Sequence, residues 1–326
     1  APNMNKHIIN KHIIIILTLL IAFIVFFTSC KSPGSDNNNN GGETPTNFED
    51  PQAQGTTYWW NDTVFYEIFV RSFYDSDGDG VGDINGLIEK LDYLNDGDPT
   101  TGTDLGVNGI WLMPVCQSPS YHGYDVMDYR TIETDYGTNA DFLRLVAAAK
   151  QRGIKIIVDL VLNHTSSQHP WFIASAQSDV TYINWYRWSV SQPTYNGPWG
   201  QQVWHSHTNG SYYYGLFWSG MPDLNYEEPA VYNEIKEIGR YWLQDMQVDG
   251  FRLDAVKYIL ESGSTLQDVQ ATYDFWRQFQ QDARQAKSSV VSIGEAWDDT
   301  EVVVNYITQG DLDVCFEFNL ATTILN

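Results

Sequence analysis

Basic residues are scarce in this 326-residue chain. Lysine and arginine together number 18, against 41 aspartates and glutamates, and the formal net charge at pH 7 is −23. A surface of that charge repels the phosphate backbone of DNA and RNA. The composition therefore argues against nucleic acid as a partner.

Cysteine is also scarce, with three residues in the whole chain. No CxxC or CxxH spacing occurs, which argues against a zinc site. Cys116 and Cys315 lie far apart, each in an apolar, strand-like run. An exported protein could bridge them, but we expect buried free thiols.

Aromatic and hydrophobic residues are abundant by contrast. The chain holds 12 tryptophans and 20 tyrosines, and 43% of its residues are hydrophobic. Such a chain can bury a large core, as one big domain or two ordinary ones. The flat aromatic faces can fill that core or stack against sugar rings, and composition leaves both possibilities open.

The first 30 residues have the pattern of an export signal. Lys6 and Lys11 precede an uncharged apolar run at 13–27. A run of about fifteen residues is short for a membrane span but typical of a signal-peptide core. Cys30 follows small residues at its end, as at bacterial lipoprotein processing sites. We expect an exported lipoprotein, anchored by lipid at the outer membrane or cell surface; an ordinary secretory signal is the alternative.

Residues 31–57 form a polar linker rich in glycine, asparagine and proline. Beyond it, apolar runs typical of buried parallel strands alternate with amphipathic helical patterns. This alternation predicts a parallel α/β fold, either a barrel or a doubly wound sheet. The expected strands are 64–73, 106–115, 153–164, 248–256, 289–297 and 313–320, and the expected helices are 85–95, 138–153, 228–246 and 265–287.

One connection breaks this alternation. Residues 164–226 are rich in tryptophan, tyrosine, serine, glycine and proline and show no clear helix. Long insertions after the carboxyl end of a strand are where α/β folds build their sites. We expect a small subdomain or a lid here.

Three strand ends carry charged and polar residues: "DLVLNH" at 159–164, "GFRLDAVKY" at 250–258 and "IGEAW" at 293–297. In a barrel such ends converge on one mouth. Arg252 and Asp254 are two residues apart, so a strand presents both on one face. This pattern predicts a site with several carboxylates around one arginine.

These three stretches resemble regions one to three of the α-amylase family, glycoside hydrolase family 13, in the family's order and spacing. "MPDLN" at 221–225 resembles its region-five motif, and "SYHGYDVMDY" at 120–129 resembles its loop after the second strand. The resemblance implies a (β/α)8 TIM barrel, here incomplete, with about six of the eight strands present. The implied parts are barrel residues 58–163, domain B at 164–226 after the third strand, and barrel residues 227–326.

The resemblance also implies a chemistry. Retaining glycosidases use two carboxyl groups about 5–5.5 Å apart across the scissile bond. Asp254 matches the nucleophile and Glu295 the general acid and base. Arg252 would keep Asp254 ionised, because a nearby cation lowers the pKa of a carboxyl group. An internal salt bridge without catalysis is the alternative.

Supporting roles follow from the same resemblance. His164 and Asp125 match residues that hydrogen-bond the sugar at the cleavage point, Tyr124 matches its stacking platform, and His122 lies near the same subsite. Lys257 matches a residue of the acceptor side, where the family has histidine in place of the next residue, Tyr258. Asp159 would orient its neighbours, and Asn163 matches a calcium-binding position of many α-amylases.

A second site is expected in "DSDGDGVGD" at 75–83. The carboxylates of Asp75, Asp77, Asp79 and Asp83 and the carbonyl of Val81 form an oxygen-rich set suited to Ca²⁺. Similar loops after the first strand bind a structural cation in oligo-1,6-glucosidase and neopullulanase-like members of the family. A solvated acidic turn is the alternative.

The family's fourth region, with a further catalytic aspartate, has no counterpart before Asn326. We therefore expect a fragment of a longer protein, inactive by itself. The expected activity of the parent is endo-acting hydrolysis of α-1,4 bonds in starch and maltooligosaccharides. An exo-acting oligo-1,6- or α-1,4-glucosidase and a non-catalytic surface glucan-binding protein stay open as alternatives.

Overall fold

The computed structural model describes residues 58–325. The expected signal peptide and linker, residues 1–57, lie outside the described residues. Within 58–325, no helix combines the length and apolar character needed to cross a membrane.

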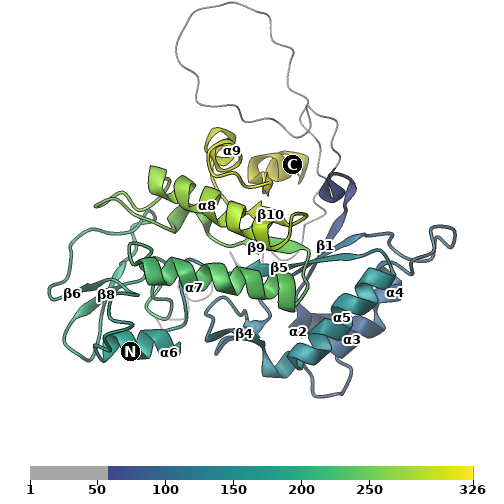
Figure 1. Ribbon diagram of the computed structural model, residues 1–326, viewed down its shortest axis with the longest axis horizontal. Coiled ribbons are helices and arrows are strands. Elements are labelled where there is room, and N and C mark those ends of the chain that lie inside the picture. The colour runs from purple at the N-terminus through teal and green to yellow at the C-terminus, as the bar shows by residue number, and fades with distance from the viewer. Residues whose placement is uncertain (1–57, 326) are drawn as a thin grey trace, which may run out of the picture.

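Six parallel strands form a half-barrel (Figure 1), which confirms the expected incomplete TIM barrel. Each strand pairs with the next one of the sheet in chain order, and β1 and β11 are its two edges in the described part of the chain. The strands are β1 (Phe65–Ile68), β2 (Gly109–Leu112), β5 (Lys155–Leu160), β9 (Gly250–Leu253), β10 (Val291–Gly294) and β11 (Val314–Cys315).

Helices cover the outer face of this sheet (Figure 1). Among them, α5 packs against α3 and β5, and α8 packs against α7 and α9. Thr138 caps α5 through a capping box with Asp141. The helices are α2 (Val70–Phe73), α3 (Ile84–Glu89), α4 (Leu91–Leu94), α5 (Asn139–Gln151), α7 (Pro229–Arg240), α8 (Gln270–Ala286), α9 (Thr300–Thr308) and α10 (Phe318–Leu325), with short turns η2 (Trp59–Asp62), η3 (Thr134–Tyr136) and η5 (Val256–Tyr258) and the π-helical η4 (Tyr241–Asp245).

The concave face of the sheet is apolar at one end and charged at the other. Ile157, Val291, Ile293 and Phe316 form a buried cluster on it. Asp159 on β5 pairs with Arg252 on β9. This pair lies two residues further along the strands than the pair Ile157 and Gly250, and therefore on the same face. The charged side chains therefore lie toward the carboxyl ends of the strands, above the apolar layer.

The insertion after β5 forms a subdomain with its own small sheet, which lies at the left of Figure 1. Its antiparallel strands β6 (Trp188–Ser189), β8 (Tyr212–Tyr214) and β7 (Trp204–Ser206) follow the order β6-β8-β7. Helix α6 (Pro170–Ala176) precedes them, although the sequence showed no clear helix there. Helix α6 is short, with Pro170 in its first turn and His169 as its cap, so it has little periodicity to reveal. A separate pair, β3 (Cys116–Gln117) and β4 (Asp128–Ile132), follows β2.

All six strands are shorter than the expected ranges, and in two of them a helix replaces part of the run. The first ends at Ile68, and α2 replaces its second half, where Arg71 and Ser72 interrupt the apolar run. The last, β11, has two residues and gives way to α10. In α10, Leu320 and Ile324 are four residues apart, which is a helical period. Cys116 and Cys315 are both free, and Cys116 is buried.

Candidate active site

Arg252 is the centre of the candidate site, on the fully buried strand β9. Its Nη1 lies 2.8 and 2.9 Å from the two carboxylate oxygens of Asp159. The same Nη1 lies 2.7 Å from Oδ1 of Asp254, and Nη2 lies 2.8 Å from Oε2 of Glu295. One guanidinium therefore contacts three carboxyl groups from three neighbouring strands.

The three carboxyl groups differ in how far their side chains are exposed to solvent. The side chain of Asp159 is 0% exposed, that of Asp254 11% and that of Glu295 26%. Burial raises the pKa of Asp159 to about 7, with Arg252 opposing the shift. Burial also raises the pKa of Glu295; Arg252 opposes this shift and Asp254 adds to it. Asp159 lies beneath the site, while Asp254 and Glu295 reach its surface.

The backbone after β9 fixes Asp254 next to Glu295. Ala255 adopts a left-handed conformation with φ 53°, which ends the extended strand directly after Asp254. Its N–H points to Oε2 of Glu295 at 3.4 Å. The N–H of Glu295 in turn donates to the Leu253 carbonyl at 3.0 Å. These contacts join the two strand ends, so the two carboxyl groups are positioned by rigid elements.

Tyr124 forms a second wall of the site. Its hydroxyl donates to Oδ2 of Asp159 at 3.1 Å, and its ring lies 5.7 Å from the Arg252 guanidinium. The His122 ring stacks on Tyr124 at 6.0 Å between centroids. Nε2 of His164 lies 3.1 Å from the Tyr124 carbonyl, and burial lowers the pKa of His164 to about 4. A neutral His164 can thus donate to that carbonyl.

Asp125 lies against two serines. Its Oδ1 accepts from the Ser118 hydroxyl at 2.7 Å and also from the Ser120 hydroxyl, and the residue is 4% exposed. The structure therefore places Asp125 beside Tyr124, within a polar pocket of its own loop.

Asn163 lies at the junction of the barrel and the inserted subdomain. Its Nδ2 donates to Oδ2 of Asp223 at 3.0 Å, and the Leu216 N–H donates to Oδ1 of Asp223 at 3.0 Å. Burial raises the pKa of Asp223 well above its usual value. In the part of the chain that the structure describes, Oδ1 of Asn163 has no hydrogen-bond partner.

The ammonium group of Lys257 forms ion pairs with two carboxylates. Its side chain is 3% exposed, and its Nζ contacts the carboxylate of Asp298 and lies 3.4 Å from Oδ2 of Asp268. The next residue, Tyr258, packs against the exposed Trp199, with ring centroids 5.6 Å apart. This wall of the site therefore combines a paired cation with an aromatic surface.

Sequence reasoning missed two side chains at the centre of the site. Glu67 on β1 is partly buried, and burial raises its pKa while the Arg252 charge opposes the shift. Trp111 on β2 lies under Arg252, at 5.3 Å from its guanidinium. A lone acid in the apolar run "VFYEIF" was the available signal for Glu67. Nothing in the sequence distinguished Trp111 from a core residue.

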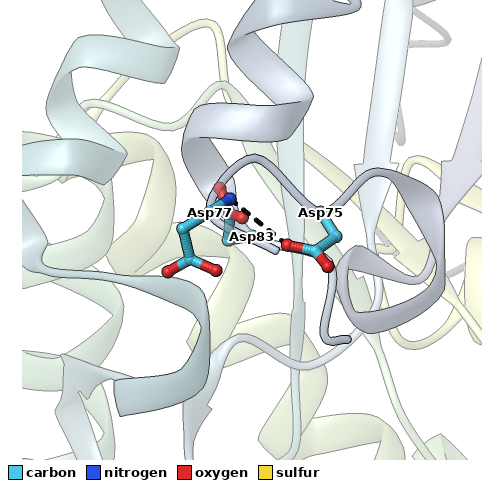
Figure 2. A group of neighbouring side chains, drawn as sticks. All are labelled: Asp75, Asp77 and Asp83. Atoms are coloured by element: carbon cyan, nitrogen blue, oxygen red, sulfur yellow. Dashed lines mark hydrogen bonds between the residues drawn. The ribbon is translucent and has the colours of Figure 1, made fainter. Parts of the chain in front are cut away.

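The acidic turn brings three of its carboxylates together (Figure 2). Oxygens of Asp75, Asp77 and Asp83 lie within 4.8 Å of one another. Asp75 accepts from the N–H groups of Gly78 and Gly80 at 2.7 and 2.8 Å. Converging carboxylates held by backbone N–H groups fit a hard divalent cation.

Asp79 and the Val81 carbonyl, the other two expected ligands, are not among these three converging groups. Asp79 is outside that group of three, and its Oδ1 accepts from the Val81 N–H at 2.8 Å. A short helix, α2, precedes the turn where a strand was expected.

Comparisons with known proteins agree with this geometry. The family model "Alpha amylase, catalytic domain" matches residues 67–326. Alpha-amylase 3 of Dictyoglomus thermophilum is 45% identical over 269 residues, which are 82% of this chain and 50% of that protein. Oligo-1,6-glucosidase of Parageobacillus thermoglucosidasius is 44% identical over 212 residues, 62% of this chain and 36% of that protein.

A solved structure gives the same result. The crystal structure of alpha-amylase from H. orenii is 50% identical, with a TM-score of 0.73, and the match covers 79% of this chain and 52% of that one. The matched part thus spans about half the length of the two alpha-amylases and 36% of the oligo-1,6-glucosidase. The family model and these relatives together place it: the chain belongs to the alpha-amylase catalytic-domain family of glycoside hydrolases.

Proposed function

We propose that the full-length protein is a retaining, endo-acting α-glucan hydrolase that cleaves α-1,4 bonds of starch and maltooligosaccharides. The observation that carries the proposal is the position of the Arg252 guanidinium, 2.7 Å from Asp254 and 2.8 Å from Glu295. Because both carboxyl groups contact the same cation, they are held in fixed positions at the ends of adjacent strands. A retaining mechanism needs two carboxyl groups fixed in this way, one as nucleophile and one as acid and base.

The two carboxyl groups take different parts in the reaction. The Asp254 carboxylate attacks the anomeric carbon, and the bond to the leaving oxygen breaks as Glu295 transfers its proton to that oxygen. The ionised Glu295 then takes a proton from water, and the hydroxyl attacks the same carbon and releases Asp254. Burial raises the pKa of Glu295, which favours the protonated form that the first step needs.

Substitution of Asp254 tests the assignment in the full-length protein. Asp254→Ala should fold normally and lose activity on soluble starch by several orders of magnitude. Azide, which is small enough to enter the vacated space, should restore bond cleavage and form a glycosyl azide of inverted configuration. Asp179→Asn, at an exposed position in the inserted subdomain, is the matched control. Near-normal turnover by Asp254→Ala would contradict the nucleophile assignment.

The endo-acting mode is supported by an aromatic row that leads away from the site. His164 contacts Phe217, Phe217 contacts Trp199, and Trp199 is 58% exposed. Exposed rings at this distance from the cleavage point can support further sugar units of a polymer. Product analysis on starch distinguishes the modes, because an endo-acting enzyme releases a mixture of oligosaccharides and an exo-acting glucosidase releases glucose.

Two other functions compete with this proposal. An exo-acting oligo-1,6- or α-1,4-glucosidase is favoured by the similarity to oligo-1,6-glucosidases. A non-catalytic surface glucan-binding protein would bind starch with no turnover even with all three carboxyl groups in place. The hydrolysis assay on starch and on isomaltose separates the three.

Ca²⁺ is the proposed occupant of the acidic turn. The three converging carboxylates of Asp75, Asp77 and Asp83 support this proposal, and Asp79 and the Val81 carbonyl would complete the set. The turn is formed by other residues than those that contact Arg252, so the ion would stabilise the fold without entering the reaction.

A lipid anchor is the proposed means of surface attachment. It rests on the apolar run 13–27 followed by Cys30. Anchoring outside the cell suits a polymeric substrate that cannot be imported whole. Labelling of the protein by a radioactive fatty acid, abolished in Cys30→Ser, would support the anchor; labelling that persists would contradict it.

A further inference from the structure

We propose that Arg187 is a positioning residue of the active site. Its ion pair with Glu261 fixes the loop that follows Asp254 against the inserted subdomain, and so shapes the side of the site that holds the leaving sugar. Nη1 of Arg187 lies 2.9 Å from Oε2 of Glu261. Arg187 stands directly before β6 of the subdomain, and Glu261 lies in the loop between β9 and α8. The inference rests on the proposed roles of Asp254 and Glu295.

This ion pair is largely withdrawn from water. The side chain of Glu261 is 5% exposed and that of Arg187 23%. Burial raises the pKa of Glu261 to about 7, and the charge of Arg187 opposes this shift. The same charge opposes the raised pKa of the buried Asp223. Loss of Arg187 would therefore leave buried carboxyl groups without their cation, which costs far more than loss of an exposed ion pair.

The loop after β9 also packs on the subdomain through apolar side chains. One buried cluster includes Ala255, Tyr258 and Leu266 of the loop and Trp204, Tyr214 and Leu216 of the subdomain. The Tyr258 ring further contacts Phe217 and Trp199, with centroids 5.7 and 5.6 Å apart. Apolar contacts are not directional, so they hold the two surfaces together without selecting one arrangement. A buried ion pair is directional and selects one.

This loop borders the side of the site where the leaving sugar lies. Glu295 transfers its proton to the leaving oxygen, so the leaving sugar lies next to Glu295 and the segment that follows it. The Val256 N–H donates to the Glu295 carbonyl at 3.3 Å, and Nζ of Lys257 lies 3.5 Å from the Trp297 carbonyl. A shift of the loop would therefore move Tyr258, the next residue, relative to the leaving sugar.

Glu261 is well placed to fix the loop because of its position within it. The Asp268 N–H donates to the Lys257 carbonyl at 3.1 Å and closes the base of the loop. Ser262 and Thr265 exchange two backbone hydrogen bonds, at 2.9 and 3.1 Å, and residues 262–265 are exposed. Glu261 is therefore the last residue before the loop turns into solvent, and its ion pair ties that point to the subdomain.

Two substrates with different leaving groups test this role in the full-length protein. Maltoheptaose places sugars on the leaving side, whereas α-maltosyl fluoride places only fluoride there. In Arg187→Met and in Glu261→Gln, kcat/KM for maltoheptaose should fall about ten- to a hundredfold, and that for the fluoride should change less than about twofold. Glu227→Gln removes an exposed contact of the same guanidinium, at 3.4 Å, and is the matched control with no change. Equal losses on both substrates would overturn the inference.

A double variant separates positioning from stability. Arg187→Met combined with Glu261→Gln removes both charges of the pair, so its melting temperature should recover most of what Arg187→Met alone loses. Its kcat/KM for maltoheptaose should stay low, because methionine and glutamine do not restore the directional contact. Arg187→Lys, which keeps the charge, should regain part of that activity. Activity that returns together with the melting temperature in the double variant would assign the pair to stability alone.

Hydrogen exchange measures the fixation of the loop without turnover. Backbone amides of residues 255–268 should exchange faster in Arg187→Met than in the parent, and at the parent rate in Glu227→Gln. Unchanged exchange in Arg187→Met would contradict the inference. A parent that cleaves neither substrate, with exchange that still responds to Arg187→Met, would instead contradict the proposed hydrolysis and leave the fixed loop supported.

Discussion

Nη2 of Arg252 lies 2.8 Å from Oε2 of Glu295, while Nη1 of the same guanidinium lies 2.7 Å from Oδ1 of Asp254. The planar fork of arginine can meet two carboxyl groups in this way, with its two terminal nitrogens at fixed separation. Asp159 shares Nη1, so three carboxyl groups face one cation. A proton retained on one of the three carboxyl groups reduces the excess of negative charge around Arg252. This agrees with the raised pKa values of Asp159 and Glu295.

Replacement of this fork should damage catalysis more than binding. Arg252→Lys offers one ammonium where two separated nitrogens are needed. We expect kcat/KM on starch to fall about a hundredfold, because a misplacement of about 1 Å has that effect. Arg252→Met leaves buried carboxylates without their cation and should lower the free energy of unfolding by about 3–5 kcal/mol. Steady-state kinetics and urea unfolding measure the two effects; a lysine variant with full activity would show that the fork is dispensable.

The raised pKa of Glu295 predicts a pH dependence of stability. Because the folded state holds this proton more tightly than the unfolded chain, Glu295 stabilises the fold most below the unfolded-state value of about 4.3. That contribution is lost as pH rises through the folded-state pKa. Glu295→Gln has no proton to release, so its free energy of unfolding should fall less over the same range. Urea titrations at a series of pH values measure the difference, and identical slopes would contradict it.

Glu295→Gln also separates the acid step from the rest of the reaction. Activity on starch should decline in the native protein as Glu295 ionises on the alkaline side. The glutamine variant should lose starch activity at every pH yet keep its first step on a glycosyl fluoride, whose leaving group needs no proton. Equal losses on both substrates would argue against the acid role.

The parallel fold was predictable because apolar runs alternate with amphipathic helical patterns, and the site was predictable because three of the strand ends carry charged and polar residues. Arg252 and Asp254 stand two apart in an apolar run, and strand alternation alone places them on one face. The strand ends were harder to predict. Ile68 ends β1, and the helical turn α2 follows it where Arg71 and Ser72 interrupt the apolar run. Periodicity over so few residues cannot separate the two structures.

The contacts between side chains of the site were the feature that the sequence predicted least well. The sequence indicates that Lys257 is a cation near the site, but not that Asp298 and Asp268 enclose it from two other segments. Likewise Asp223 in "MPDLN" was conspicuous, while its contact with Asn163 depends on how the subdomain folds back on the barrel. Such contacts arise from chain segments far apart in sequence, which local patterns do not report.

The acidic turn predicts a response to chelation. Binding of Ca²⁺ to the folded state alone raises stability by about 2.7 kcal/mol at a hundredfold excess over Kd. A chelator should therefore lower the melting temperature by about 4 °C in a chain of 326 residues. Asp77→Ala should abolish that response, and Asp98→Ala, in another exposed acidic turn, should keep it. A melting temperature that does not change when chelator is added would identify the cluster as a solvated acidic turn.

Lys257 should be coupled energetically to Asp298. The lysine side chain is 3% exposed, and its contact lowers the pKa of Asp298 below the usual range. A lowered folded-state pKa stabilises the fold above the unfolded value of about 3.9 and is lost as pH falls through the folded one. Lys257→Met should remove that dependence and lower the free energy of unfolding at pH 7 by about 1–3 kcal/mol, since Asp298 stays partly hydrated.

A double-mutant cycle with Asp298→Asn measures this coupling. The two substitutions together should cost less than the sum of the single ones by at least about 0.5 kcal/mol, because each removes the same ion pair. Lys257→Arg, which keeps the charge but not the shape, should recover part of the stability. Strict additivity would mean that Lys257 and Asp298 act independently, and a rise in KM for maltooligosaccharides without loss of stability would assign Lys257 to the substrate instead.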